Sequence, residues 1–95
     1  MFYLQENCSV CRDGLLGFLL CSDAKTVVVM CEECCSVWLT PDELEQPPIV
    51  TEAPRYLLPE SDVSISGGAA RWASFQEIDA SGMSGYASRG REYIR

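Results

Sequence analysis

The chain of 95 residues contains no histidine, the side chain that most often performs general acid–base chemistry near neutral pH. It also lacks a Gly-x-Ser-x-Gly motif or a comparable pairing of a serine nucleophile with a base. The adjacent carboxylates Glu32-Glu33 and Asp42-Glu43 lie in a cysteine motif and at a predicted helix start, which account for them. These absences predict that the protein is not an enzyme.

Long apolar runs are absent as well. No stretch approaches the roughly 20 residues that a membrane-spanning helix needs, and the start, MFYLQENC, lacks the basic and apolar regions of a signal peptide. With 47% hydrophobic residues, the chain is not expected to be disordered. We therefore expect a cytoplasmic protein without membrane association, folded as a single domain over residues 1–95.

Cysteine is absent after residue 35, although residues 1–35 contain six cysteines. A disulfide framework usually staples a small secreted chain along much of its length, which this distribution would not do. Two Cys-x2-Cys motifs separated by nineteen residues can instead bring four thiolates around one ion, and Zn²⁺ prefers four tetrahedral sulfurs. The sequence predicts one structural zinc ion bound by Cys8, Cys11, Cys31 and Cys34.

Cys21 and Cys35 remain outside this predicted site. Because Cys31 and Cys35 are four positions apart, Cys35 replaces Cys34 as the fourth ligand if the segment is helical, but the matching spacing of the two motifs favours Cys34. One hypothesis makes Cys21 and Cys35 redox thiols whose oxidation releases zinc. The favoured interpretation is that Cys21 is a small core residue and Cys35 a bystander, since the neighbouring glutamates disfavour an extra thiolate.

The segment between the two motifs predicts a β-hairpin. Residues 15–21 and 25–30 are rich in strand formers, including three consecutive valines, and Ser-Asp-Ala between them is typical of a turn. With the four cysteines, about the first forty residues resemble the zinc-ribbon class, as found in RNA polymerase subunits. That resemblance implies that these cysteines are the ligands. In the usual ribbon, glycine often follows a cysteine pair directly. In this chain the first pair is followed by Arg12-Asp13-Gly14 and the second by Cys35.

The remaining chain predicts short elements packed on the ribbon. The ribbon spans residues 1–40 and ends in a third short strand at Ser36–Trp38. Residues 41–70 form a short helix, capped by Thr40 and Glu43, which is followed by a Pro-rich segment that wraps across the ribbon. In residues 71–95, Ser74 and Glu77 cap a second helix, whose Phe75 and Ile78 face inward, and a final strand or tail follows. We expect a small, metal-stabilised α+β fold, with a zinc-ribbon hairpin or three-stranded sheet and one or two short helices.

Basic residues are scarce where a nucleic-acid-binding ribbon needs them. The formal net charge is −7; residues 1–48 contain two basic and eight acidic residues, and residues 49–95 contain five and six. Neutralising phosphates supplies most of the energy of non-specific nucleic-acid binding, so the ribbon is not expected to bind nucleic acid. Three arginines near the end, Arg89, Arg91 and Arg95, are interpreted as a solvated or internally paired stretch rather than an RNA-binding tail.

An acidic surface is suited to a basic protein partner. The order of features is similar to that of small, uncharacterised bacterial zinc-ribbon proteins, and small acidic immunity proteins neutralise basic toxins. The predicted function is therefore a non-catalytic, acidic, zinc-ribbon binding module of the immunity or inhibitor type. Its candidate partner-binding residues are Trp38, Trp72, Glu32, Glu33, Asp42 and Glu43, together with Phe2, Tyr3, Tyr56 and Glu45. For each aromatic, packing in the core is the favoured alternative.

Two other functions remain as alternatives. A transcription- or RNA-associated ribbon would retain nucleic acid in a strongly salt-dependent way. A thiol-based redox or zinc sensor would release its metal on mild oxidation. A homodimer formed through an exposed edge of the ribbon hairpin is a further hypothesis.

Overall fold

The computed structural model describes residues 2–92, which form an antiparallel sheet of six strands with little helix. The strands are β1 (Phe2–Asn7), β2 (Leu15–Leu20), β3 (Val27–Cys31), β4 (Val37–Trp38), β5 (Arg71–Trp72) and β6 (Gly90–Glu92). The helical elements are α1 (Phe75–Ala80) and two 3-10 helices, η1 (Pro41–Glu43) and η2 (Ser84–Arg89). None of the described helices is long and apolar enough to cross a membrane.

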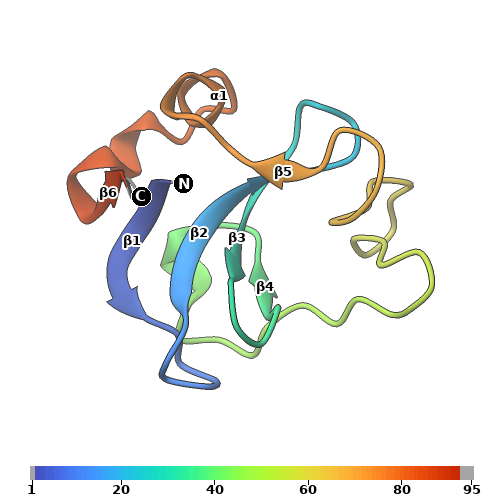
Figure 1. Cartoon of the computed structure of the whole chain (residues 1–95), viewed down its shortest axis with the longest axis horizontal. Coiled ribbons are helices and arrows are strands. Elements are labelled where there is room, and N and C mark those ends of the chain that lie inside the picture. The colour runs from blue at the N-terminus through green and yellow to red at the C-terminus, as the bar shows by residue number, and fades with distance from the viewer. Residues whose placement is uncertain (1, 93–95) are drawn as a thin grey trace.

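The sheet is built around the β2–β3 hairpin, as the sequence predicts (Figure 1). Its strands pair from Leu16 opposite Cys31 to Leu20 opposite Val27. The turn is fixed by Asp23, whose carboxylate accepts hydrogen bonds from the backbone N–H groups of Lys25 and Thr26 at 3.0 and 2.9 Å. These hydrogen bonds, above all the one from the Thr26 backbone, lower the pKa of Asp23.

Both edges of this hairpin are covered. Strand β4 pairs with β3, while β1 and β5 share the other edge of β2, β1 against residues 15–17 and β5 against residues 19–20. Strand β6 then pairs with the far side of β1. Most of the hairpin edge invoked for a homodimer is therefore already paired with neighbouring strands, and of β3 only Val27 and Val28 lie beyond the end of β4.

The two faces of the sheet carry separate apolar clusters. Large side chains such as Phe18, Trp38 and Ile78 fill one cluster, which α1 covers. The other cluster contains Val28 and Val37, and it is covered by side chains of the segment that follows η1. Figure 1 shows this segment, green to yellow, looping beside β3 and β4. Its backbone meets the β-sheet region at two places, through an isolated bridge between Val37 and Ile49 and through backbone hydrogen bonds of Ser64 and Ala69 with Ser22 of the hairpin turn.

The sheet is larger than the predicted three strands, and the fold is mostly β rather than α+β. The third strand predicted at Ser36–Trp38 is present as β4. The final strand, which the sequence offers as an alternative to a tail, is present as β6. Strands β1 and β5 are not predicted, because β1 is polar in its second half and β5 is only two residues long. Short strands of this kind are defined by their partners rather than by a local pattern.

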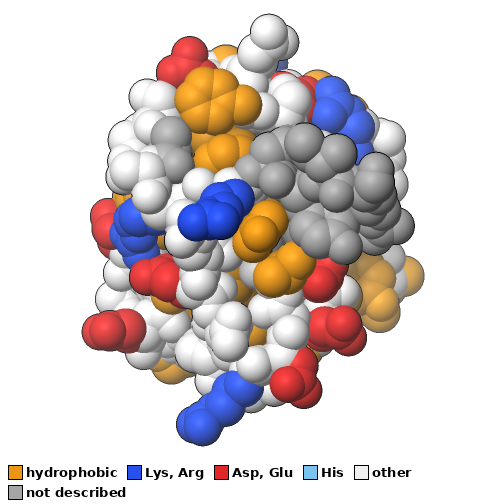
Figure 2. All heavy atoms as spheres, turned by 60° about the vertical axis from the view of Figure 1, so that its left-hand side comes forward, with side chains coloured by type: hydrophobic (Ala, Val, Ile, Leu, Met, Phe, Trp, Pro, Cys, Tyr) orange, Lys and Arg blue, Asp and Glu red, His pale blue; other side chains and the backbone are white. Residues whose placement is uncertain are grey.

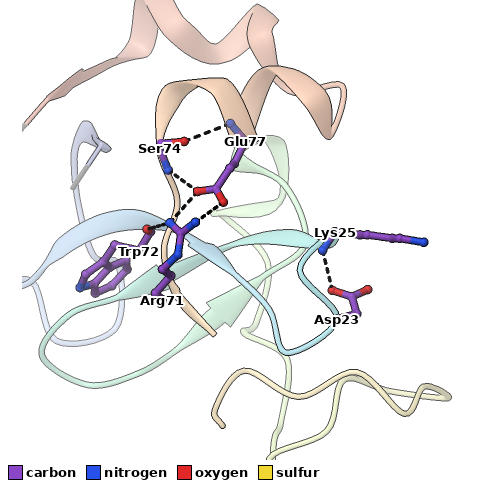
Figure 3. Close-up of polar contacts among 6 residues, drawn as sticks. All are labelled: Asp23, Lys25, Arg71, Trp72, Ser74 and Glu77. Atoms are coloured by element: carbon purple, nitrogen blue, oxygen red, sulfur yellow. Dashed lines mark hydrogen bonds and ion pairs between the residues drawn. The ribbon is translucent and has the colours of Figure 1, made fainter. Parts of the chain in front are cut away.

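The two predicted helices have different outcomes. The one after Thr40 is a single 3-10 turn, although the Glu43 carboxylate accepts a hydrogen bond from the Thr40 backbone N–H at 3.2 Å as predicted. The second helix forms as α1, where Ser74 and Glu77 make the reciprocal capping contacts (Figure 3). Ile78 is fully buried, but Phe75, predicted to face inward, is 47% exposed, and its ring centroid lies 5.9 Å from that of Phe2.

An ion pair ties α1 to β5. The Arg71 guanidinium donates to both carboxylate oxygens of Glu77, and one of its nitrogens also donates to the Trp72 carbonyl (Figure 3). Because Glu77 also caps Ser74, one carboxylate fixes the start of the helix relative to the strand before it. Hydrogen bonds from the Ser74 backbone and from Arg71 lower the pKa of Glu77.

The end of the described chain is fixed by a second set of contacts. Arg89 donates to both carboxylate oxygens of Glu6 at 3.1 Å and to Asp42 at 3.2 Å, and the Tyr86 hydroxyl donates to Asp42 at 2.7 Å. At Gly90, an added Cβ would overlap the Phe2 ring, so β6 approaches β1 closely. Arg95, the last of the three arginines noted in the sequence, lies outside the described residues.

The buried Trp38 provides a test of this core. Its indole is 1% exposed and donates to the Gln46 carbonyl at 3.0 Å. We expect Trp38→Phe to lower the free energy of unfolding by about 1–3 kcal/mol, because it leaves a void and an unsatisfied carbonyl. The half-buried Trp72 is the control, and Trp72→Phe should cost less. Urea denaturation measures both, and equal losses would contradict the assignment of Trp38 to the core.

Candidate metal centre

The sheet brings the two Cys-x2-Cys motifs to one end of the molecule. Cys8 and Cys11 lie in the loop between β1 and β2, and Cys31 and Cys34 lie at the end of β3 and in the loop that leads to β4. Because these strands are antiparallel neighbours, the two loops emerge side by side, at the lower end of the sheet in Figure 1. The register of the hairpin therefore sets the distance between the two motifs.

The four sulfur atoms converge on one point. The Sγ atoms of Cys8 and Cys34 are 3.7 Å apart, those of Cys11 and Cys31 are 3.6 Å apart, and all four lie within 4.8 Å of one another. A tetrahedral ion with metal–sulfur distances of about 2.3 Å requires sulfur–sulfur distances of about 3.8 Å. A disulfide requires about 2.05 Å. The spacing fits four ligands of a single metal ion such as zinc.

The two loops have the same local structure around their first cysteine. The backbone N–H of Val10 donates to Cys8 Sγ at 3.4 Å, and that of Glu33 donates to Cys31 Sγ at 3.4 Å. Such hydrogen bonds stabilise the thiolate form of the sulfur, which is the form that binds metals. Each motif therefore contributes backbone donors as well as two ligands.

The position after each motif has a left-handed backbone. Arg12 has a φ of 64° and Cys35 a φ of 61°. Their N–H groups donate to the carbonyls of Cys8 and Cys31 at 3.0 and 3.1 Å, which closes each loop. Glycine is the residue that favours this conformation. Here Arg12 and Cys35 adopt it instead, and the loops keep their geometry although neither residue is glycine.

Gly14 is the glycine that the centre requires. A Cβ at this position would overlap Cys31 Sγ and would lie 3.0 Å from Cβ of Glu33. The backbone of the first loop is thus packed directly against the sulfur of the second. Gly14 lies close to the first motif in the sequence, but its role could not be predicted there, because it depends on a contact with the second loop.

The four thiols differ in burial and acidity. Cys8 and Cys31 are buried, Cys11 is half-buried and Cys34 is exposed. Burial raises the pKa of Cys31 to about 12. For Cys34, the effect of burial is outweighed by hydrogen bonds, first from Ser36, whose Oγ lies 3.2 Å from Sγ, and the pKa falls to about 6. A buried thiolate at Cys31 needs a nearby positive charge, which a bound cation provides.

The remaining cysteines do not belong to the cluster. The cluster contains Cys34 rather than Cys35, which favours Cys34 as the fourth ligand. Cys21 lies five residues beyond Leu16, which pairs with Cys31, and is therefore roughly 16 Å along the strand at 3.3 Å per residue. It is fully buried, and burial followed by the charge of Asp23 raises its pKa to about 11. Cys21 is a core residue, too far from the cluster to act as a ligand.

The structure places some of the predicted partner-binding residues on the surface and others in the interior. Glu32 and Glu33 are exposed in the second cysteine loop. The side chain of Trp38 is buried in the core, as in the alternative that the sequence favours for each aromatic. Trp72 is half-buried in β5.

Asp42 and Glu43 are already engaged within the chain. Asp42 accepts from Tyr86 and Arg89, and Glu43 caps η1. Of the predicted acidic residues, Glu32, Glu33 and Glu45 make no ion pair or hydrogen bond through their carboxylates within the described chain, and the first two lie beside the cluster of cysteines.

No protein-family model, curated protein or solved structure matches this chain. The fold and the cluster together define its class: a small, mostly β protein with a six-stranded antiparallel sheet and a four-cysteine site suited to one metal ion.

Metal binding by serine variants tests the ligand assignment. We expect the wild type to bind one Zn²⁺ and Cys34→Ser to lose most of its affinity, because a hydroxyl does not replace a thiolate ligand. Cys35→Ser should bind one Zn²⁺ like the wild type. Native mass spectrometry and competition with a chromogenic chelator measure both. The reverse order of the two variants would show that Cys35 is the ligand.

Proposed function

We propose that this protein is a non-catalytic zinc-ribbon module that binds a basic protein partner. The observation that carries this proposal is the closed cluster of four thiols. A catalytic zinc keeps one position for water, whereas four cysteines fill a tetrahedral coordination sphere. When bound, zinc holds the two loops together and supplies folding energy. The site then has a structural role, and the function belongs to the surface around it.

The acidic surface at the metal end supports a basic partner. Asp13, Glu32 and Glu33 are exposed in the two cysteine loops, beside the exposed Arg12. Four thiolates and one divalent cation add about −2 to this end of the molecule. Like charges that are concentrated at one end attract a partner of opposite charge and accelerate encounter.

The arginines of the C-terminal region do not favour nucleic acid. Arg89 is engaged by Glu6 and Asp42, which leaves it less able to neutralise a phosphate. In Figure 2, which brings this side of the molecule forward, Lys and Arg side chains are spread over the face, and Asp and Glu side chains lie among them. A phosphate-binding surface would instead gather its cations in one patch.

Within this class, an immunity or inhibitor protein fits the observations best. Such a protein needs a small rigid scaffold, no catalytic group and an acidic surface that meets a basic toxin. The metal-stapled sheet provides the scaffold, and the cysteine loops provide the surface. The proposal is specific about charge, since it requires the partner to present lysine or arginine side chains to the metal end.

Charge reversal at the metal end tests this proposal. Tagged, zinc-loaded protein is used to capture partners from nuclease-treated lysate of its own host. We expect the wild type to retain a stoichiometric basic protein and the double variant Glu32→Lys/Glu33→Lys to weaken its binding by at least about tenfold, since like charges across an interface are strongly unfavourable.

The matched control reverses two exposed carboxylates elsewhere, Glu60→Lys/Asp62→Lys, which changes the net charge by the same amount. Its binding should stay near that of the wild type at physiological salt. Recovery of nucleic acid, or of proteins that are lost on nuclease treatment, would overturn the proposal in favour of an RNA-associated ribbon. An equal loss in the control would show that only net charge matters.

A further inference from the structure

A groove lies beside the metal centre, between the second cysteine loop and the segment that covers the sheet. Its volume is about 440 Å³. It is lined by Met30, Cys34, Cys35, Thr51, Tyr56, Ile65 and Ser66. The groove therefore joins the exposed ligand of the metal centre to an apolar part of the surface.

The walls of the groove are suited to an aliphatic stem. Met30 and Ile65 pack at the border of the apolar cluster formed by Val28 and Val37. Tyr56 is 38% exposed and contributes an aromatic ring to the lining. An unbranched chain of methylene groups can pack against such walls while its end stays in a polar environment.

The polar atoms of the groove all suit a hydrogen-bond donor with positive charge. Cys34 Sγ is exposed, and as a metal ligand it carries thiolate charge. The hydroxyls of Thr51 and Ser66 make no hydrogen bond with another described residue, so their oxygens are available as acceptors. No lysine or arginine lines the groove. The groove thus combines negative charge, acceptors and apolar walls.

We propose that this groove receives an arginine side chain of the basic partner. The aliphatic part of the arginine packs on Met30 and Ile65, its guanidinium plane stacks on Tyr56, and its N–H groups donate towards Cys34 Sγ and the two hydroxyls. This inference rests on the proposed function, because it assigns a contact point to the same basic partner.

Arginine fits the groove better than lysine. Its guanidinium is planar, presents five donors and stacks on aromatic rings, whereas an ammonium group is compact and strongly hydrated. A guanidinium can therefore contact the Tyr56 ring and several acceptors together. An arginine of this chain already illustrates the chemistry elsewhere, since Arg89 contacts two carboxylates and lies 5.7 Å from the centroid of the Tyr86 ring.

The test uses N-acetyl-arginine amide as the probe and two-dimensional ¹H–¹⁵N NMR of the full, zinc-loaded chain. We expect saturable shift changes at the amides of Cys35, Thr51, Tyr56 and Ile65. N-acetyl-citrulline amide, which has the same shape without charge, should bind at least about fivefold more weakly, and the lysine analogue should fall between them.

A variant locates the site. In Tyr56→Asn the ring is removed, while asparagine tolerates the left-handed backbone of this position, whose φ is 50°. Arginine binding should weaken by about threefold or more. Leu39→Ala, which removes an exposed apolar side chain outside the groove, is the control and should bind like the wild type. Unchanged dispersion of the spectra confirms that both variants are folded.

Two results would overturn this inference. One is equal binding of arginine and citrulline analogues. The other is a set of shift changes confined to the separate acidic groove that contains Glu6, Asp42 and Glu45. If either result is found while the protein still captures a basic partner, the arginine groove is wrong but the proposed function stands. Failure of this inference can therefore be distinguished from failure of the proposed function.

Discussion

The convergence of four thiols at one end of the sheet is the constraint on which the rest of the structure depends. The β2–β3 register places Cys31 opposite Leu16, next to the first loop, and Gly14 lets the two loops touch. In the absence of a cation, Cys31 would be a buried thiol with a raised pKa beside three other thiols. A bound divalent ion would replace these protons and link β1, β2, β3 and β4 at a single point. A chain of this size has a limited core, so we propose that such a link is a large part of what makes the sheet stable.

The opposite end of the sheet is held by ordinary side-chain contacts. Arg71 and Glu77 fix α1 to β5, and Asp23 fixes the hairpin turn. Because Arg71 is exposed and Glu77 only half-buried, their ion pair contributes little by itself, and burial of Ile78 provides the main attachment of α1. This arrangement leaves the metal end as the place where exposed carboxylates, an accessible thiolate and an apolar groove meet. The proposed binding function follows from that coincidence.

The elements that could be predicted from the sequence are those encoded locally. The Cys-x2-Cys spacing, the valine run with its Asp23 turn, and the Ser74–Glu77 capping pair each appear within a few residues, and each is present. Strands β1 and β6 depend on pairing between the two ends of the described chain, which no short window contains. The same is true of the contact between Arg89 and Glu6, 83 positions apart, and of the hydrogen bond from Trp38 to the Gln46 carbonyl, which lies beyond η1. The groove at Tyr56 also arises from segments that meet only in the folded chain.

The dependence of the fold on the metal is the central claim, and one measurement tests it most directly. Amide NMR spectra of the zinc-loaded chain are compared before and after removal of the metal with a strong chelator at neutral pH under reducing conditions. The account predicts that the dispersed spectrum collapses, first for residues of the two cysteine loops and the strands they join, and that one equivalent of Zn²⁺ restores it. A dispersed spectrum that is unchanged after complete metal removal would contradict the account, because the sheet would then be stable without the link between its loops.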